Sequence, residues 1–486
     1  MSVVRKIAKN TAWLFVADVI SKISVFLLSI IIAQSMGDEA FGKYSLAIAF
    51  SFFFIIISQL GMKIILIREI AKNPKQTQSY LGNSLVIKLV LSLFSFVLLI
   101  MITSLFDYPA NIKMIIYLFT TGGIIFSVSH IFQSVFVAHE KMKFSAIISM
   151  AENISILLIS VFILSLKKDI VLLGIGYLIA SIIVLITSII ITSKKLVVVK
   201  LDFNFKIFKL LIISSLPLLV SSLFGIITLK IDTIMLSLFK SVTVVGWYNA
   251  SYQIVGGLLF IPIILCTSLF PSMVKSYKKS HEMLSEILTK SVKYLTIIVI
   301  PFIIIIVSYS KFIIILLFGQ QFIKGAYSLQ ILMIALFFMY LIRPFAYLLF
   351  SSDKLKHFLI SVITISIINV VLNLLFIPKM GHVGAALTTL VSTFIGLVMM
   401  IYFSSSIVHV NLFNILHKPI LLGLLLFGIM RLLSNINALF VVTIIILLYI
   451  ILLFILRVFD QKEISYLKDI FLFLISKLGI QNRLSK

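Results

Sequence analysis

The residues that could do chemistry in this sequence are the few charged side chains that lie inside long apolar segments. Basic side chains in such a setting attract phosphate, which Arg binds by paired hydrogen bonds and Lys as a point charge. Acidic side chains there can act as coupling sites for ions. A charge is costly in hydrocarbon, so each usually faces a cavity or another charge. The set comprises Asp18, Lys22, Lys63, Lys88, Glu152, Lys230, Asp232 and Arg343.

The basic members Lys22, Lys63, Lys88 and Arg343 are the candidate substrate-binding residues. Simpler roles compete with this one. Asp18 lies four residues before Lys22, so the two could neutralise each other on one helix face. Lys63 and Lys88 fall near predicted helix ends, where a lysine can extend to the lipid head groups. Arg343 lies deeper, and we expect it to face a cavity.

The acidic members Asp18, Glu152 and Asp232 are the candidate ion-coupling residues. Glu152 could instead pair with a lysine, and Asp232 could cap a helix or pair with Lys230. His130 also lies in an apolar segment, where an interhelical hydrogen bond is its simplest role.

These residues must be positioned by membrane-spanning helices. The chain is 61% hydrophobic and 12% charged, whereas about a quarter of the residues in soluble domains are charged. The mean hydropathy is +1.23. Apolar segments of about 20 residues, the length that crosses a bilayer, recur along the whole chain. The sequence therefore predicts an all-α polytopic membrane protein and not a β-barrel, which would have short alternating segments.

We expect about 14 transmembrane helices. The predicted spans are roughly 11–34, 42–66, 81–105, 113–138, 145–166, 171–192, 209–238, 246–271, 292–318, 327–350, 357–377, 382–404, 418–433 and 437–456. The segment 200–211 is amphipathic and is predicted to lie on the cytoplasmic surface.

The net charge of +25 is explained by orientation. If both termini are cytoplasmic, about 27 of the 41 lysines and arginines fall on the inner side and about 9 on the outer side. This asymmetry predicts a cell-membrane protein with cytoplasmic termini, and it removes the need for a nucleic-acid partner. The four candidate substrate-binding residues then lie toward the cytoplasmic half, with Asp18 and Glu152 opposing them. Lys230 and Asp232 lie toward the outer half.

An internal repeat organises the chain. Residues 27–47 align without a gap with residues 231–251, so that Gly42 matches Gly246 and Tyr44 matches Tyr248. A weaker match relates 171–181 to 382–392. Duplicated halves are common in transporters. We therefore predict a six-helix bundle at 1–200, a second at 201–405, two additional transmembrane helices at 406–460, and a cytoplasmic interfacial amphipathic helix at 461–486.

No pattern of an enzyme is present in the sequence. There is no Walker motif, no zinc-ligand spacing and no Ser-His-Asp pattern, and Cys266 is the single cysteine. We expect no catalytic residues, no cofactor and no metal. A membrane-bound glycosyltransferase or polymerase would need acidic catalytic loops, and the predicted outer loops are short and poor in Asp and Glu.

Three segments resemble a known family. They read SMGDEAFGKYSLAIAF (35–50), IDTIMLSLFKSVTVVGWYNASYQI (231–254) and IPKMGHVGAALTTLVS (377–392). They are similar to the polysaccharide-transporter branch, the Wzx-type O-antigen and capsule flippases, of the multidrug/oligosaccharidyl-lipid/polysaccharide (MOP) exporter superfamily. The resemblance covers essentially the full chain.

The resemblance implies a MATE-like fold of two six-helix bundles that work by alternating access. It implies a flippase that carries polyprenyl-pyrophosphate-linked oligosaccharide from the cytoplasmic to the outer leaflet, with membrane lipid, H+ or Na+ and a polysaccharide polymerase complex as further partners. A lipid II flippase and a cation-coupled multidrug antiporter of the same superfamily remain alternatives. The excess of basic over acidic residues in the inner half favours an anionic head group over a cationic drug.

Overall fold

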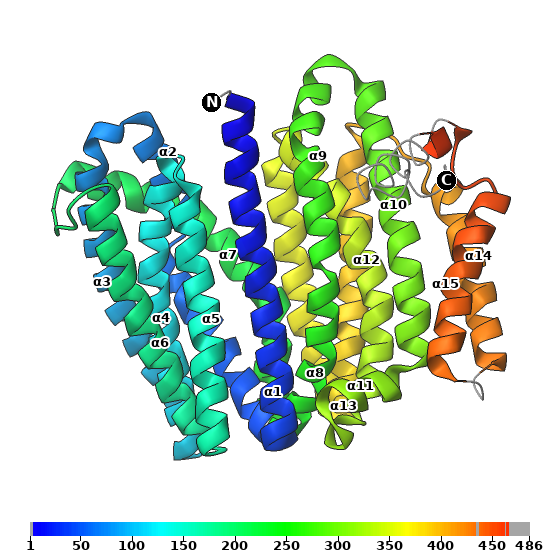
Figure 1. Ribbon diagram of the computed structural model, residues 1–486, viewed down its shortest axis with the longest axis horizontal. Coiled ribbons are helices and arrows are strands. Elements are labelled where there is room, and N and C mark those ends of the chain that lie inside the picture. The colour runs from blue at the N-terminus through cyan, green and yellow to red at the C-terminus, as the bar shows by residue number, and fades with distance from the viewer. Residues whose placement is uncertain (1–2, 434–436, 462, 466–486) are drawn as a thin grey trace, which may run out of the picture. The chain divides into compact units, whose positions relative to one another are not determined.

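The computed structural model describes residues 3–433, 437–461 and 463–465, with side chains from residue 10 onward (Figure 1). The described chain is helical and contains no strand. In the first half the helices are α1 (Val3–Gln59), α2 (Met62–Lys72), α3 (Thr77–Ser104), α4 (Ala110–Ala138), α5 (Met142–Leu166) and α6 (Ile170–Lys195). The later helices are α7 (Phe205–Phe239), α8 (Val242–Leu258), α9 (Phe260–Lys279), α10 (His281–Ser308), α11 (Ser310–Phe318), α12 (Gly325–Ser351), α13 (Leu355–Ser405), α14 (Leu412–Leu432) and α15 (Ala438–Ile455).

Twelve stretches of the described chain are long and apolar enough to cross a membrane. Two of them are divided into two long helical segments at a glycine with positive φ, Gly37 (φ 82°) and Gly381 (φ 57°), and the first is interrupted again at Leu60–Gly61, before the short helix α2. The described residues therefore provide fourteen helical segments, in agreement with the expected number. At each break the helix is interrupted at a single residue, because glycine adopts this backbone conformation without strain.

The second span ends earlier than predicted. Leu60 and Gly61 both have positive φ, 53° and 71°, and the short helix α2 begins directly after them. Its apolar face, including Ile65 and Leu66, packs into a core shared with α3 and α4. Lys63, predicted inside the span 42–66, lies beyond the break on the exposed side of α2.

The ninth span and the connector between the halves also differ from the prediction. The helix predicted at 292–318 begins at His281 and ends at Ser308, and α11 is a separate short helix. Residues 200–204 are not helical but lie against α3, where Ser79 donates to Asp202 at 2.6 Å and the Asn83 amide oxygen accepts from the Asn204 backbone at 2.9 Å. The segment 200–211 is therefore not a separate surface helix. Its first part is held against α3, and its second part belongs to α7, which starts at Phe205.

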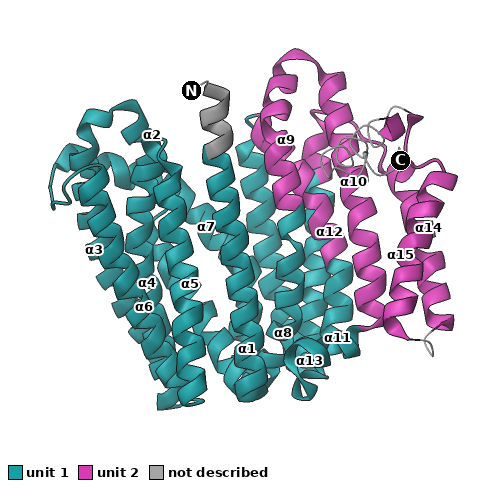
Figure 2. Cartoon of the chain, in the orientation of Figure 1, with its two compact units in different colours: residues 1–261, 310–335, 353–400 teal, residues 262–309, 336–352, 401–486 magenta. Residues whose placement is uncertain are grey.

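The described contacts divide the chain into two compact units (Figure 2). Unit 1 contains residues 1–261, 310–335 and 353–400, and unit 2 contains residues 262–309, 336–352 and 401–486. In unit 1, α1 packs against α4, α5 and α8, and α4 packs against α6. The predicted bundle boundaries at 200 and 405 stay a prediction.

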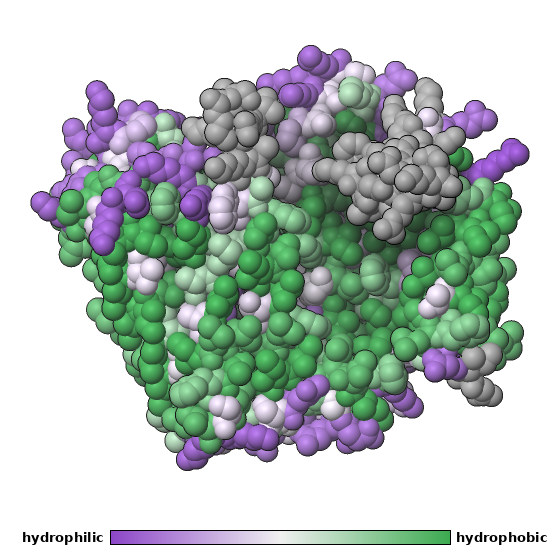
Figure 3. Space-filling model, in the orientation of Figure 1, coloured by the Kyte–Doolittle hydropathy of each residue, from purple (hydrophilic) through white to green (hydrophobic). Residues whose placement is uncertain are grey.

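Unit 1 has the surface of an integral membrane protein. Figure 3 shows apolar side chains over the lateral face of this unit and hydrophilic ones at the helix ends. On α3 one face is formed by exposed apolar residues, Leu89, Val90, Leu93, Phe94, Val97 and Met101. An exposed apolar face of this extent suits lipid and not water.

The two members of the repeat meet in unit 1. A Cβ atom on Gly42 of α1 would overlap the backbone oxygen of Val242, and a Cβ on Gly246 of α8 would overlap the backbone oxygen of Asp38. Each glycine thus packs against the carbonyl oxygen of the residue four positions before the other glycine. The absence of a side chain at both positions is what lets the two backbones touch.

In unit 2, α10 packs against α14 and α15. The Tyr449 hydroxyl of α15 donates to the Ile297 carbonyl of α10 at 2.9 Å. Glu463, after the last span, is buried and accepts hydrogen bonds from Lys293 at 2.6 Å and Tyr294 at 2.8 Å. Most of the predicted interfacial helix 461–486 lies outside the described residues.

Candidate functional site

A chain of polar side chains runs through the interior of unit 1. Gln59 of α1 contacts His130 of α4, with 3.2 Å between Nε2 and Nδ1. The other ring nitrogen of His130 lies 3.2 Å from Oε2 of Glu152 on α5. Asn153 of α5 donates to the hydroxyl of Ser21 on α1 at 2.9 Å. His130 therefore makes the interhelical contacts that the sequence suggested, and it links α1 to the candidate acid Glu152.

These side chains border a cavity of about 400 Å³, which we call the bundle cavity. It is formed by α1, α4, α5, α6 and one residue of α7. Its polar lining consists of Ser24, Tyr44, Ser51, Gln59, His130, Glu152, Asn153 and Tyr177, and its apolar lining includes Phe52, Phe126 and Ile156. The sequence did not single out Gln59, Asn153 or Tyr177, because nothing in their own spacing says that they share a cavity.

Aromatic rings form one wall of the bundle cavity. The ring of Tyr177 lies 5.1 Å from that of Phe119 and 5.3 Å from that of Phe126, and Tyr44 meets Phe119 edge-on at 5.5 Å. Gly122 of α4 makes room for this wall, since a Cβ there would come within 2.5 Å of the Tyr177 ring. The dipeptide Gly122–Gly123 in an apolar helix was the available sequence signal for such a close approach.

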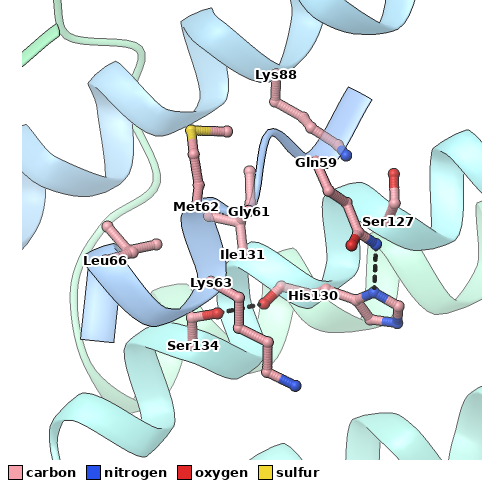
Figure 4. Close-up of a pocket in the computed structure, with 10 residues that line it drawn as sticks. All are labelled: Gln59, Gly61, Met62, Lys63, Leu66, Lys88, Ser127, His130, Ile131 and Ser134. Atoms are coloured by element: carbon pink, nitrogen blue, oxygen red, sulfur yellow. Dashed lines mark hydrogen bonds between the residues drawn. The ribbon is translucent and has the colours of Figure 1, made fainter. Parts of the chain in front are cut away.

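A smaller cavity of about 40 Å³ adjoins the bundle cavity and shares Gln59 and His130 with it (Figure 4). Lys63 of α2 and Lys88 of α3 line this smaller cavity, which we call the basic pocket. In the close-up the two lysines come from different helices; the amine of Lys88 lies near Gln59 and Ser127, and that of Lys63 points away from Lys88. Two of the four candidate cations thus line one pocket, which shares with the bundle cavity His130, the partner of Glu152.

Lys88 has an unusual environment. Its side chain is 1% exposed, and its ammonium donates to the Ser58 hydroxyl at 3.0 Å. That hydroxyl lies 3.4 Å from the Ser127 hydroxyl. Within the described residues Lys88 has no carboxylate partner. An ammonium buried against neutral hydroxyls is poorly compensated, and an anion would relieve that cost.

The other candidate cations are placed differently. Lys22 is exposed on α1, and its ammonium lies 5.5 Å from the centre of the Phe260 ring. Asp18 is also exposed, and the structure forms no ion pair between it and Lys22 in the described part of the chain. Arg343 is half-buried on α12 and belongs to unit 2.

Asp232 lies in a second polar cluster of unit 1. Its side chain is 2% exposed and accepts hydrogen bonds from Tyr248 at 2.6 Å, Thr389 at 2.9 Å and Asn373 at 2.6 Å. Lys230 does not pair with it, and instead lies over the Phe52 ring at 5.4 Å. The side chain of Tyr248 is itself buried as a donor to Asp232.

Groups that could hold a metal are not gathered anywhere in the described residues: no cluster of three or more His, Cys, Asp and Glu side chains occurs there. Cys266 is a buried free thiol. The site is composed of hydrogen-bonding and aromatic side chains with basic and acidic groups, the last including Glu152.

Comparison with known proteins identifies relatives. Residues 7–277 match a family model described as "Polysaccharide biosynthesis protein". A Staphylococcus aureus protein, capsular polysaccharide biosynthesis protein CapF, is 25% identical over 407 residues, which cover 81% of this chain and 98% of CapF.

Two solved structures share the fold. The lipid II flippase MurJ, in an inward closed conformation, has a TM-score of 0.75 at 19% identity, covering 91% of this chain and 98% of MurJ. An inward-facing multidrug resistance MATE family transporter of the MOP superfamily has a TM-score of 0.66 at 15% identity, covering 79% of this chain and 95% of the other. The expected MATE-like, all-α fold is confirmed.

Proposed function

The chain belongs to the polysaccharide biosynthesis protein family, and from this premise we propose that it is a lipid-linked oligosaccharide flippase. Its substrate is a polyprenyl-pyrophosphate-linked oligosaccharide, which it carries from the cytoplasmic to the outer leaflet by alternating access. The product supplies a surface polysaccharide such as a capsule. The name of the CapF relative supports the link to capsule.

The observation that carries this proposal is the buried ammonium of Lys88. It lies inside a membrane protein without a carboxylate partner in the described structure, and Lys63 lines the same basic pocket. A pyrophosphate is the part of the proposed substrate that needs such a group, because its negative charge must be compensated where water is scarce. Lys22 and Arg343 are further candidate contacts along the route.

We assign the coupling of transport to the membrane acids. Asp232 is the strongest candidate, because its carboxylate is buried among three donors on α8 and α13. Glu152 is the second, through its contact with His130, and Asp18 is exposed on α1. The coupling ion is H+ or Na+. The protein resides in the cytoplasmic membrane with both termini inside, and a polysaccharide polymerase complex receives its product.

The alternatives differ in substrate. A lipid II flippase is supported by the fold shared with MurJ and by the fourteen helical segments. A cation-coupled multidrug antiporter is supported by the acid in the bundle cavity, but Lys88, which has no carboxylate partner in the described part of the chain, disfavours a cationic cargo.

Gene deletion in the native host tests the proposal. We expect loss of one surface polysaccharide and accumulation of its complete lipid-linked unit on the cytoplasmic side. Complementation with Lys88→Met should restore about a tenth of the export or less, because Met keeps the volume of the side chain but not its charge. Lys168→Met, at an exposed loop position, is the matched control and should restore export fully. Normal export in the deletion strain, with only drug tolerance changed, would overturn the proposal.

A further inference from the structure

We propose that the bundle cavity is a saccharide subsite that takes an uncharged sugar ring of the head group, while the adjoining basic pocket faces the phosphate. This inference rests on the proposed function. It adds the position of the two ends of the head group, with the sugar in the bundle cavity and the phosphate at the basic pocket. It also restricts the sugar class: a neutral hexose or an acetamido sugar fits, and a uronic acid does not.

The lining of the bundle cavity has the two features that sugar rings need. The aromatic faces of Phe126 and Tyr177 can pack against the CH face of a pyranose. Around them stand an amide at Asn153, a second amide at Gln59 and a carboxylate at Glu152. These groups supply both donors and acceptors for vicinal hydroxyls.

Two hydroxyl groups of the lining lack a partner. The side chain of Tyr44 is 8% exposed, and both Tyr44 and Tyr177 line the cavity. Neither hydroxyl makes a hydrogen bond within the described structure. Neither oxygen is among the fully buried polar atoms without a partner in the described residues, so both hydroxyls are accessible from the cavity and can hydrogen-bond a ligand or solvent there.

The size of the bundle cavity suits this role. Its volume of about 400 Å³ lies within the range of roughly 300–1,000 Å³ that is typical of small-molecule sites. A water occupies about 30 Å³, so the cavity is far larger than a site for a single bridging water.

The distribution of charge sets the direction of the substrate. No Lys or Arg is among the residues that line the bundle cavity, and Glu152 is its one carboxylate. A phosphate or a uronate placed there would face like charge without compensation. Lys63 and Lys88 line only the basic pocket, and Gln59 and His130 form the boundary between the two cavities.

Binding measurements on the full chain in lipid nanodiscs test the inference. The probes are short-chain polyprenyl pyrophosphates, either bare or carrying one glucose, galactose, N-acetylglucosamine or glucuronate. We expect at least one uncharged sugar to tighten binding over the bare compound, and glucuronate to give no gain. Tyr177→Phe and Asn153→Ala should each raise the Kd of the sugar-bearing compound by about fivefold to tenfold. They should leave the Kd of the bare compound unchanged.

Two controls keep the outcomes apart. Tyr117→Phe changes a tyrosine of α4 whose hydroxyl contacts Thr103 and which does not line the cavity, so it should bind every probe like the parent. Lys88→Met should weaken the binding of bare and sugar-bearing probes by the same factor.

The subsite is refuted if all sugar-bearing probes, glucuronate included, bind no better than the bare compound. It is also refuted if Tyr177→Phe weakens binding of the bare compound as much as binding of the sugar-bearing ones. The proposed function fails, and the subsite with it, if the parent protein binds no polyprenyl pyrophosphate. A cavity that instead binds ethidium in a Glu152-dependent way, with no sugar effect, is a site for organic cations.

Discussion

At the scale of single residues, two buried charged side chains differ in whether an opposite charge lies beside them in the described structure. Lys88 and Glu463 are both buried charged residues. Glu463 has an ammonium partner in Lys293, whereas Lys88 donates to the Ser58 hydroxyl and has no carboxylate partner among the described residues. The ion pair of Glu463 anchors its segment, and for the Lys88 ammonium we propose an anion of the substrate as the partner. Sequence could place Lys88 in an apolar helix, but Ser58 is on another helix, and their contact follows from packing.

The Glu463 contact predicts a pH dependence of stability. Burial alone would raise the pKa of Glu463, but hydrogen bonds from Lys293, from the Asp460 backbone and from Tyr294 leave it below the ordinary 4.5. A lowered carboxylate pKa contributes stability that is present above the unfolded-state pKa and is lost as the pH falls through the folded-state value. The thermal unfolding midpoint of the parent protein in detergent should therefore fall as the pH is lowered below about 4.5.

Substitution of Glu463 measures the contribution of its contacts to stability. Glu463→Gln should lower stability at pH 7 by about 1–3 kcal/mol, since it leaves the Lys293 ammonium without its counter-ion, and should flatten the decline in acid. Glu286→Gln, which alters an exposed ion pair with Lys290 on the same helix, should change the unfolding midpoint little. Equal midpoints for the two variants would show that the buried pair does not anchor the segment after α15.

At the scale of elements, glycines decide how closely the helices approach. Gly42 and Gly246 allow α1 and α8 to touch, and Gly122 lets Tyr177 of α6 lie against α4. The repeat in the sequence matched Gly42 with Gly246 and so predicted that the two positions are equivalent. It could not predict that they touch, because an alignment of one segment with another carries no information about their distance.

Alanine at the α1–α8 crossing should separate the two helices. Gly42→Ala and Gly246→Ala should each destabilise the protein by about 1–3 kcal/mol, because the added methyl group meets backbone, which cannot rotate away. The double variant should cost less than the sum, since either methyl already opens the same contact. Gly256→Ala, with nothing within 4 Å of the added Cβ, is the control and should keep the parent midpoint. Additive losses would argue against a shared contact.

Alanine at Gly122 should act on the bundle cavity. The new methyl group would push the Tyr177 ring from α4 toward the cavity and narrow it. We expect Gly122→Ala to reduce the sugar-dependent part of substrate binding by about tenfold with a smaller effect on the bare polyprenyl pyrophosphate. Gly225→Ala, where the Cβ meets open space, should bind like the parent. An unchanged sugar gain in Gly122→Ala would show that Tyr177 does not touch the sugar.

At the scale of the whole molecule, the sequence predicted what depends on hydrophobic length and missed what depends on packing. The expected number of spans and the fold class are confirmed, because each helix must cross the same thickness of hydrocarbon. The breaks at Gly37 and Gly381 fall between predicted spans. The break at Leu60 was missed because apolar residues continue across it, and the start of α10 was placed too late because the residues from His281 to Ser291 are largely polar. The partners of Asp232, namely Tyr248, Asn373 and Thr389, come from distant parts of the chain, and no local pattern connects them.

The central claim is that this chain moves a lipid-linked oligosaccharide between leaflets and uses Lys88 for the phosphate. The most direct measurement reconstitutes the purified protein in liposomes with the lipid-linked unit that accumulates in the deletion strain. A membrane-impermeant reagent that modifies the sugar then reports how much substrate is reachable from outside over time.

With the parent protein and with Lys168→Met, the account predicts that the protected inner-leaflet fraction becomes reachable. With Lys88→Met, the rate should fall by about tenfold or more. A protected fraction that stays constant in liposomes containing folded parent protein, whichever coupling ion is supplied, would contradict the account.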